Sequence, residues 1–133
     1  MSVEDNRQVV MDFFAAGERG DMEACFALLA DDISWTNIGS TASSGCYTGR
    51  QSLIEELIGP LFAQLKNGIS STIENLFAEG EVVVAQSSGK AETVDGVPCN
   101  NSYCQVMRIR DGRICSVKGY IDTELAAEVL KRS

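Results

Sequence analysis

The chemistry open to this chain is limited, because its 133 residues include no histidine. Without an imidazole, the chain cannot pair a serine or cysteine nucleophile with histidine, and it has no histidine general base or zinc ligand. Its chemistry must therefore use carboxylates, lysine, tyrosine, cysteine or uncharged hydrogen-bonding groups. The five cysteines are odd in number and lack C-x-x-C spacing, which argues against a disulfide framework and a zinc knuckle.

Size and charge exclude further classes of function. We expect a single domain over residues 1–133. The net charge of −8 repels phosphate and no basic patch is visible, so we expect no nucleic-acid or membrane partner. The N-terminal residues do not resemble a secretory signal, and no apolar run approaches the ~18 residues of a membrane span. These features predict a cytoplasmic protein whose cysteines are reduced thiols.

The elements that must position any site begin with helices. Ser2 and Asp5 form a capping-box pattern before an apolar stripe, which predicts a helix over 3–18. Asp21 can cap a second, short helix. The acidic pair Asp31-Asp32 is expected to end that second helix.

A short strand and a third helix follow in the expected order. The strand is expected over 33–37, and the Gly, Ser and Thr residues of 39–49 predict a mobile loop. A second capping-box pattern at Thr48 predicts a helix that continues to Leu65. The Gly59-Pro60 pair inside this helix should kink or divide it.

In the second half the apolar period changes from 3.6 to 2, which is typical of strands. Candidate turns at Glu79-Gly80, Asp95-Gly96 and Asp111-Gly112 separate the expected strands, which cover 69–78, 81–93, 99–110 and 113–121. Asp122 should then cap a short closing helix. The sequence therefore predicts an α+β fold in which three N-terminal helices pack on one face of a curved, mostly antiparallel sheet, with a short C-terminal helix.

Several segments stand in a characteristic order along the chain. They are Gly20-Asp21, Leu29 to Ile33, Gly45, Gly49-Arg50, Val106 to Ile114 and Gly119 to Asp122. Together they resemble the nuclear transport factor 2-like superfamily, and within it the SnoaL-like and ketosteroid-isomerase-related branch. The resemblance implies a strongly bent sheet wrapped around the helices, with a pocket between them. It says little about activity, because this fold serves isomerases, cyclases, epoxide hydrolases, dehydratases and non-catalytic binders.

The resemblance also places the catalytic groups of ketosteroid isomerases on this chain. Their aspartate base falls on Asn37, which cannot accept and hold a proton. Their oxyanion pair, a tyrosine and a protonated acid, falls on Phe13 and Gln105. Phe13 donates nothing, although the Gln105 amide can donate one hydrogen bond. We therefore do not expect steroid-isomerase chemistry.

Relatives of limonene-epoxide hydrolase carry an Arg-x-Asp pair on the long second strand and an aspartate on the last strand. When the hairpins are aligned on the turn at Gly96, Gln86 and Ser88 fall at the Arg-x-Asp positions. A shift of one residue places Ser87 and Gly89 there instead. Gly119 stands where the last aspartate should be. We therefore do not expect water activation by those carboxylates.

Strand alternation and the resemblance together predict the pocket. For an enzyme, Asn37 and Gln105 would hold a substrate oxygen, Tyr103 would assist, and Lys90 or an unplaced carboxylate would move the proton. The other expected ligand-binding residues are Phe13, Trp35, Leu57, Leu61, Gln86, Ser88, Asn101, Met107, Val117, Gly119 and Ile121. This mixture suits a small, largely apolar ligand with carbonyl or hydroxyl groups.

Each candidate also has a purely structural interpretation. Asn37 and Gln105 could be paired with neighbouring backbone or buried water. Trp35, Met107 and the other large apolar residues could simply fill the core. Lys90 could lie in solvent, or, if buried beside a ligand, act as a base or imine-forming amine.

Two hypotheses follow from the sequence. The first is a SnoaL-like small-molecule-binding protein that works without metal or cofactor, with isomerisation, cyclisation or dehydration as an open extension. The second is a non-catalytic dimerisation or ligand-sensing module whose cavity is vestigial. A protein-transport adaptor is a weaker third, because no distinctive partner motif is present. We also expect a homodimer through the outer sheet face, whose predicted apolar residues are Cys104, Val106, Ile114 and Tyr120.

Overall fold

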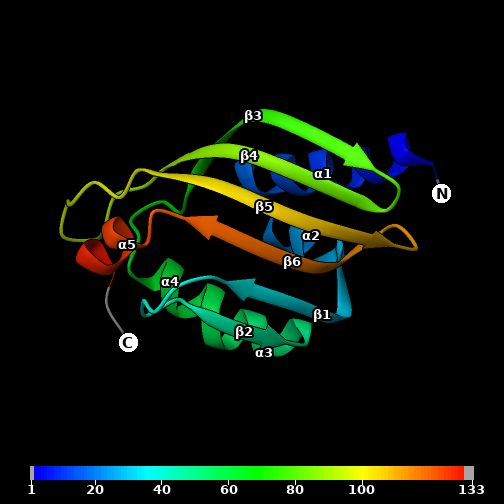
Figure 1. Cartoon of the computed structure of the whole chain (residues 1–133). Coiled ribbons are helices and arrows are strands. Elements are labelled where there is room, and N and C mark those ends of the chain that lie inside the picture. The colour runs from blue at the N-terminus through cyan, green and yellow to red at the C-terminus, as the bar shows by residue number, and fades with distance from the viewer. Residues whose placement is uncertain (1, 131–133) are drawn as a thin grey trace.

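The computed structural model describes residues 2–130 and contains one six-stranded sheet in the order β2-β1-β6-β5-β4-β3 (Figure 1). The strands are β1 (Leu29–Asn37), β2 (Gly45–Thr48), β3 (Ser70–Glu79), β4 (Val82–Lys90), β5 (Asn101–Arg110) and β6 (Arg113–Ile121). The helices are α1 (Val3–Glu18), α2 (Met22–Ala27), α3 (Arg50–Leu53), the π-helical η1 (Ile54–Ile58), α4 (Gly59–Ala63) and α5 (Thr123–Val129). The predicted mixed α+β fold with a curved sheet is confirmed.

The helices cover one face of the sheet. In Figure 1, α1 and α2 lie behind the long strands, and α5 lies at the end of the sheet where β6 finishes. Strands β3 to β6 form the expected antiparallel meander, whereas β1 pairs in parallel with β6. The parallel pairing joins the first strand of the chain to the last.

The beginning of α1 follows the prediction. The Ser2 side chain accepts a hydrogen bond from the Asp5 backbone N–H, and the Asp5 carboxylate accepts one from the Ser2 N–H. This reciprocal pair satisfies two backbone donors that the first turn of a helix leaves without partners. Val9 and Val10 of α1 are buried against the sheet.

The end of the second helix differs from the prediction. Helix α2 ends at Ala27, and the acidic pair expected to end it lies within β1 instead. Both acids are exposed and paired, Asp31 with Arg50 and Asp32 with Arg110. Charged residues fit a strand where their side chains reach solvent, so the pair did not mark a break in structure.

The third helix is slightly shorter and less regular than predicted. It consists of α3, η1 and α4 in succession, so the expectation of three simple N-terminal helices is met only in outline. The π-helical turn immediately precedes Gly59-Pro60, as expected where proline removes a backbone donor and crowds the preceding turn. Thr48 does not cap this helix, because Gly49 is the N-cap residue and makes no side-chain hydrogen bond. Part of the expected mobile loop is strand β2.

Two of the three predicted turns are tight. Gly80 (φ 58°) joins β3 to β4, and Asp111 (φ 52°) and Gly112 (φ 77°) join β5 to β6. The third, Asp95-Gly96, lies within a ten-residue connection over 91–100 rather than a two-residue hairpin turn. This longer connection changes which side chains of β4 face inward, as described below.

None of the helices in the described part of the chain is long and apolar enough to cross a membrane. The five cysteines all carry free thiols.

Candidate functional site

A cavity of about 410 Å³ lies between the inner face of the sheet and the helices. Its wall is built mainly from apolar side chains of α1, α2, η1, α4 and α5, together with inward-facing residues of the strands. The strands contribute most of the polar groups, because alternate residues of each strand point to this face.

Ten of the residues predicted for the pocket line this cavity. They are Phe13, Trp35, Asn37, Leu57, Leu61, Asn101, Tyr103, Gln105, Gly119 and Ile121. Met107 and Val117 do not line it, because they lie in the fully packed core with exposed fractions of 0% and 1%.

Gln86, Ser88 and Lys90 are corrections to the predicted site, because the structure places them on the outer face of β4. The inward residue is Ser87, which pairs with Tyr103, is 2% exposed and lines the cavity. The prediction assumed a tight hairpin at Asp95-Gly96, whereas the longer connection shifts the pairing of β4 with β5 by one residue. Lys90 is exposed and therefore cannot serve as the buried base.

The Asn37 side chain is already paired within the protein. Its Oδ1 accepts a hydrogen bond from Trp35 Nε1 (3.0 Å), and its Nδ2 donates to the Ser43 carbonyl (3.0 Å). Gly119 lies opposite, where a Cβ would come within 3.1 Å of the same Oδ1. Asn37 thus joins β1 to the loop before β2, and it takes the structural role that was its alternative interpretation.

Asn101 is paired in a similar way at the end of β5. Its Nδ2 donates to the Asp122 carbonyl (3.2 Å), and its Oδ1 accepts from the backbone N–H groups of Ser102 (2.8 Å) and Asp122 (3.0 Å). Asp122 in turn caps α5, because its carboxylate accepts from the Leu125 N–H (3.2 Å). Asn101 therefore fixes the start of α5 against the sheet.

Tyr103 and Gln105 are the polar side chains of the predicted catalytic set that remain available to a ligand. They are two residues apart on β5, so both face the cavity, and within residues 2–130 neither side chain forms a hydrogen bond. Burial raises the pKa of Tyr103 to about 12, with a smaller contribution from the neighbouring Cys99. The Tyr103 hydroxyl is therefore protonated at neutral pH and can donate a hydrogen bond.

The Tyr103 ring lies over a strand position that has no side chain. A Cβ at Gly89 would come within 2.5 Å of the ring carbon Cε2 and 3.0 Å of Ile69 Cγ2. Glycine is thus required here because the ring occupies the space of a side chain. The prediction considered Gly89 only as an alternative register and did not connect it with Tyr103.

Glu18 is a lining residue that the sequence analysis missed. It is the last residue of α1 and the single charged residue that lines the cavity in the described part of the chain. Its carboxylate accepts hydrogen bonds from the Ser71 backbone N–H and the Ser70 hydroxyl (3.3 Å). Its position in the last turn of a helix gave no sequence signal, since acidic residues are common on helix surfaces.

Two thiols also line the cavity. Burial raises the pKa of Cys25 to about 11, with a smaller contribution from Asp21, and burial raises the pKa of Cys99 as well. Both are therefore protonated at neutral pH and are poor nucleophiles. Among residues 2–130, no group of three or more acidic or cysteine side chains is placed to hold a metal ion.

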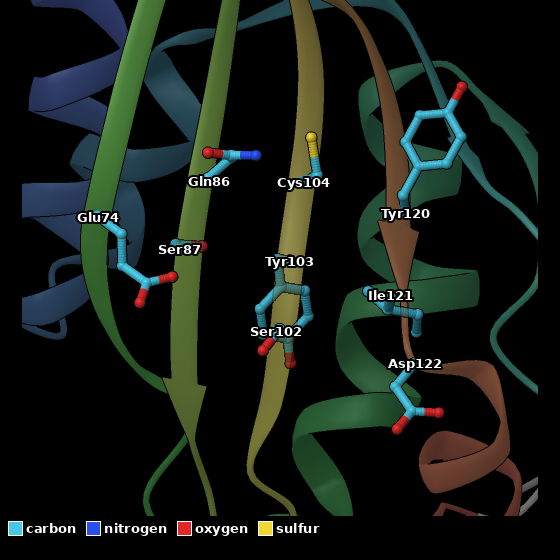
Figure 2. A pocket seen from close by; sticks show the side chains of 9 residues that line it. All are labelled: Glu74, Gln86, Ser87, Ser102, Tyr103, Cys104, Tyr120, Ile121 and Asp122. Carbon is cyan, nitrogen blue, oxygen red and sulfur yellow. The ribbon is translucent and has the colours of Figure 1, made fainter.

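A second hollow, of about 450 Å³, lies on the outer face of the sheet. Figure 2 shows side chains from four neighbouring strands around it: Glu74 on β3, Gln86 on β4, Cys104 on β5 and Tyr120 on β6. Ile114 was expected on this face, but it is fully buried in the core because a bulge in the β5–β6 pairing turns it inward. This hollow includes the acidic residues Glu74 and Asp122 among its lining residues, whereas the cavity has Glu18 as its charged lining residue.

Comparison with known proteins identifies the family. The model of the SnoaL-like domain matches residues 10–117. The chain belongs to the SnoaL-like family. The predicted nuclear transport factor 2-like superfamily is thereby confirmed. A search of curated proteins found no match to this family member.

Solved structures support the same fold over nearly the whole chain. A nuclear transport factor 2-like protein from Burkholderia xenovorans is 25% identical, with a TM-score of 0.77 over 98% of this chain and 99% of that one. TerC, co-crystallised with polyporic acid, is 18% identical, with a TM-score of 0.82 over 94% of this chain and 97% of TerC. An epoxide hydrolase from Mycobacterium tuberculosis, related to limonene-epoxide hydrolase, is 19% identical, with a TM-score of 0.77 over 96% and 90%.

Proposed function

We propose that this SnoaL-like protein binds a small, largely apolar molecule that carries a carbonyl or hydroxyl group. The observation that carries the proposal is the cavity of about 410 Å³, in which Tyr103 and Gln105 offer polar groups without partners in the described chain. Cavities of this size and composition suit small ligands held by apolar contact and oriented by a few polar groups.

The arrangement of these two side chains favours an oxygen-bearing ligand. The protonated Tyr103 hydroxyl and the Gln105 amide are both hydrogen-bond donors on the same face of β5. A ligand oxygen held between them would replace hydrogen bonds that these groups otherwise make to water. The structural neighbour TerC was co-crystallised with polyporic acid, which supports the use of this fold for small organic ligands.

Turnover lies beyond what we propose. The Asn37 amide, which was predicted to hold a substrate oxygen, is already hydrogen-bonded to Trp35 and Ser43. The predicted base Lys90 lies outside the cavity. Glu18, the carboxylate that lines the cavity, is exposed and hydrogen-bonded to β3. Isomerisation, cyclisation or dehydration would need one of these groups to move or a base on the ligand itself.

The alternative of a vestigial cavity is less well supported. That hypothesis requires large side chains to plug the space, but Phe13 and Trp35 line the cavity without filling it, and Met107 lies in the core. We also propose a homodimer through the outer sheet face. The half-buried Val106 and Cys104 and the exposed Tyr120 support this pairing, because a shared apolar patch is commonly buried by two-fold association.

Native mass spectrometry of the purified protein is the primary test. We expect a species heavier than the bare chain that loses its extra mass when the protein is denatured, and that mass identifies the ligand class. Trp35 is the single tryptophan of the chain and lines the cavity, so its fluorescence reports occupancy in a parallel titration with cyclic ketones and phenols. If no molecule is retained and no compound changes the fluorescence, the proposed binding function is wrong.

A further inference from the structure

We propose that Glu18 makes the cavity select uncharged ligands over anions of the same shape. The natural ligand is then a neutral ketone, amide, alcohol or phenol rather than a carboxylate or phosphate ester. This inference rests on the proposed binding function of the same cavity and adds the charge of the ligand to it.

The exposed lining residues indicate where the cavity opens. Among the residues that line the cavity, three are exposed, namely Glu18, Gly20 and Asn67, and the others are buried or half-buried. Glu18 and Gly20 flank the connection between α1 and α2, and Asn67 lies between α4 and β3. These exposed residues place the opening beside the two connections, so an entering ligand would pass the Glu18 carboxylate.

The Glu18 carboxylate is hydrogen-bonded to the neighbouring strand. The Ser71 backbone N–H and the Ser70 hydroxyl donate to its two oxygens from the beginning of β3. These hydrogen bonds join the end of α1 to the other side of the mouth. They hold the negative charge beside the beginning of β3.

Within residues 2–130, no cationic side chain lines the cavity or forms an ion pair with Glu18. The neighbouring Arg19 pairs with Asp21 instead (3.8 Å). Helix α1 also directs the negative end of its dipole toward the mouth, and its last turn holds no basic residue. An anionic ligand meets repulsion from both sources.

The test compares two probes of nearly the same shape, adamantane-1-carboxamide and adamantane-1-carboxylate, by titration of Trp35 fluorescence. In the unaltered protein the amide should bind about tenfold or more tightly than the carboxylate, and high salt should reduce this ratio by screening. In Glu18→Gln the ratio of the amide affinity to the carboxylate affinity should fall about threefold to tenfold. The substitution keeps an oxygen that can accept the Ser71 hydrogen bond.

The control is Glu23→Gln, which removes one negative charge from an exposed position of α2 that does not line the cavity. It should leave the ratio of the two affinities unchanged. Equal binding of both probes, or a ratio that neither salt nor Glu18→Gln alters, would overturn the inference while leaving the proposed function standing. Absence of a fluorescence change with either probe would instead count against the proposed function. The salt series needs no variant, so the inference stays testable if Glu18→Gln folds poorly.

Discussion

Side chains of the same chemical type have different roles around the cavity. The amides of Asn37 and Asn101 are both saturated by groups of the protein, and each of them joins two segments of backbone. The amide of Gln105 and the hydroxyl of Tyr103 have no such partner in the described residues. Residue type alone could not separate these cases, because the difference depends on which backbone groups lie within reach.

Removal of the Tyr103 hydroxyl should weaken binding without harming the fold. In Tyr103→Phe we expect a loss of about threefold to tenfold in affinity for a ketone or phenol, the contribution of one hydrogen bond of about 1 kcal/mol. The free energy of unfolding of the empty protein should stay about the same, because the hydroxyl has no protein partner to lose. Fluorescence titration and chemical denaturation measure the two quantities.

Tyr120→Phe is the matched control, because it removes the same hydroxyl from the outer face of the sheet. Equal affinities of Tyr103→Phe and Tyr120→Phe would show that the hydroxyl of Tyr103 does not contact the ligand.

Burial of Tyr103 and Cys25 predicts a loss of stability at alkaline pH. Their folded pKa values are raised from 10.0 to about 12 and from 9.0 to about 11. The unfolded chain therefore loses these protons first, and the free energy of unfolding should decrease as pH rises above 9. Denaturant titrations at several pH values measure the decrease. Tyr103→Phe should abolish the share of this decrease that falls between pH 10 and 12, which amounts to at most about 3 kcal/mol of unfolding free energy. A decrease of the same size in that variant would contradict the assignment.

At the scale of the element, β4 and β5 show how a single connection decides a site. The ten residues 91–100 replace the expected tight turn, and the pairing that results turns Ser87 inward and Gln86 outward. It also brings Gly89 beneath the Tyr103 ring. Side-chain orientation across the whole strand thus depends on the length of the connection that follows it.

Gly89→Ala should disturb the site through the ring of Tyr103. The added methyl group would overlap Cε2 of the ring, so the ring or the strand must move. We expect a destabilisation of about 1–3 kcal/mol, as for other overpacked positions, and a fall in affinity at least as large as that of Tyr103→Phe. Thermal unfolding and fluorescence titration provide the measurements.

The control for the stability of Gly89→Ala is Gly17→Ala in α1, where an added Cβ meets nothing within 4 Å. The free energy of unfolding of that variant should rise by up to about 1 kcal/mol, because alanine has a higher helix propensity than glycine. A Gly89→Ala protein as stable as the unaltered chain, with unchanged affinity, would show that the ring adjusts without cost.

The elements were predictable where local patterns decide them, and less so where pairing between distant segments does. The capping box at Ser2, the cap at Asp122 and the meander of the last four strands each follow from neighbouring residues. The parallel pairing of β1 with β6 and the register of β4 depend on segments far apart in the sequence. For the same reason the cavity walls were largely anticipated, whereas Glu18 was missed and Lys90 was misplaced.

At the scale of the whole molecule, the outer sheet face gives a prediction about assembly. Size-exclusion chromatography with light scattering should return twice the chain mass of 14.3 kDa. Val106→Asp places a charge on the half-buried outer face, so it should shift the protein toward the single chain. The control is Lys66→Asp, at an exposed position beyond α4, which should leave the oligomeric state unchanged. A 14.3 kDa species for the unaltered protein at all concentrations would refute the homodimer.

The parallel contact between β1 and β6 has a consequence for how the chain folds during synthesis. Asn37 lies beside Gly119, so the wall of the cavity joins residues from the two ends of the chain. Bringing β1 and β6 together closes a long loop, which lowers the entropy of the chain before the contact stabilises it. Contacts between distant residues therefore slow folding. On a ribosome, helices α1 to α4 would emerge well before β6, the strand that completes their enclosure. We therefore expect their apolar surfaces to stay exposed until β6 has been synthesised.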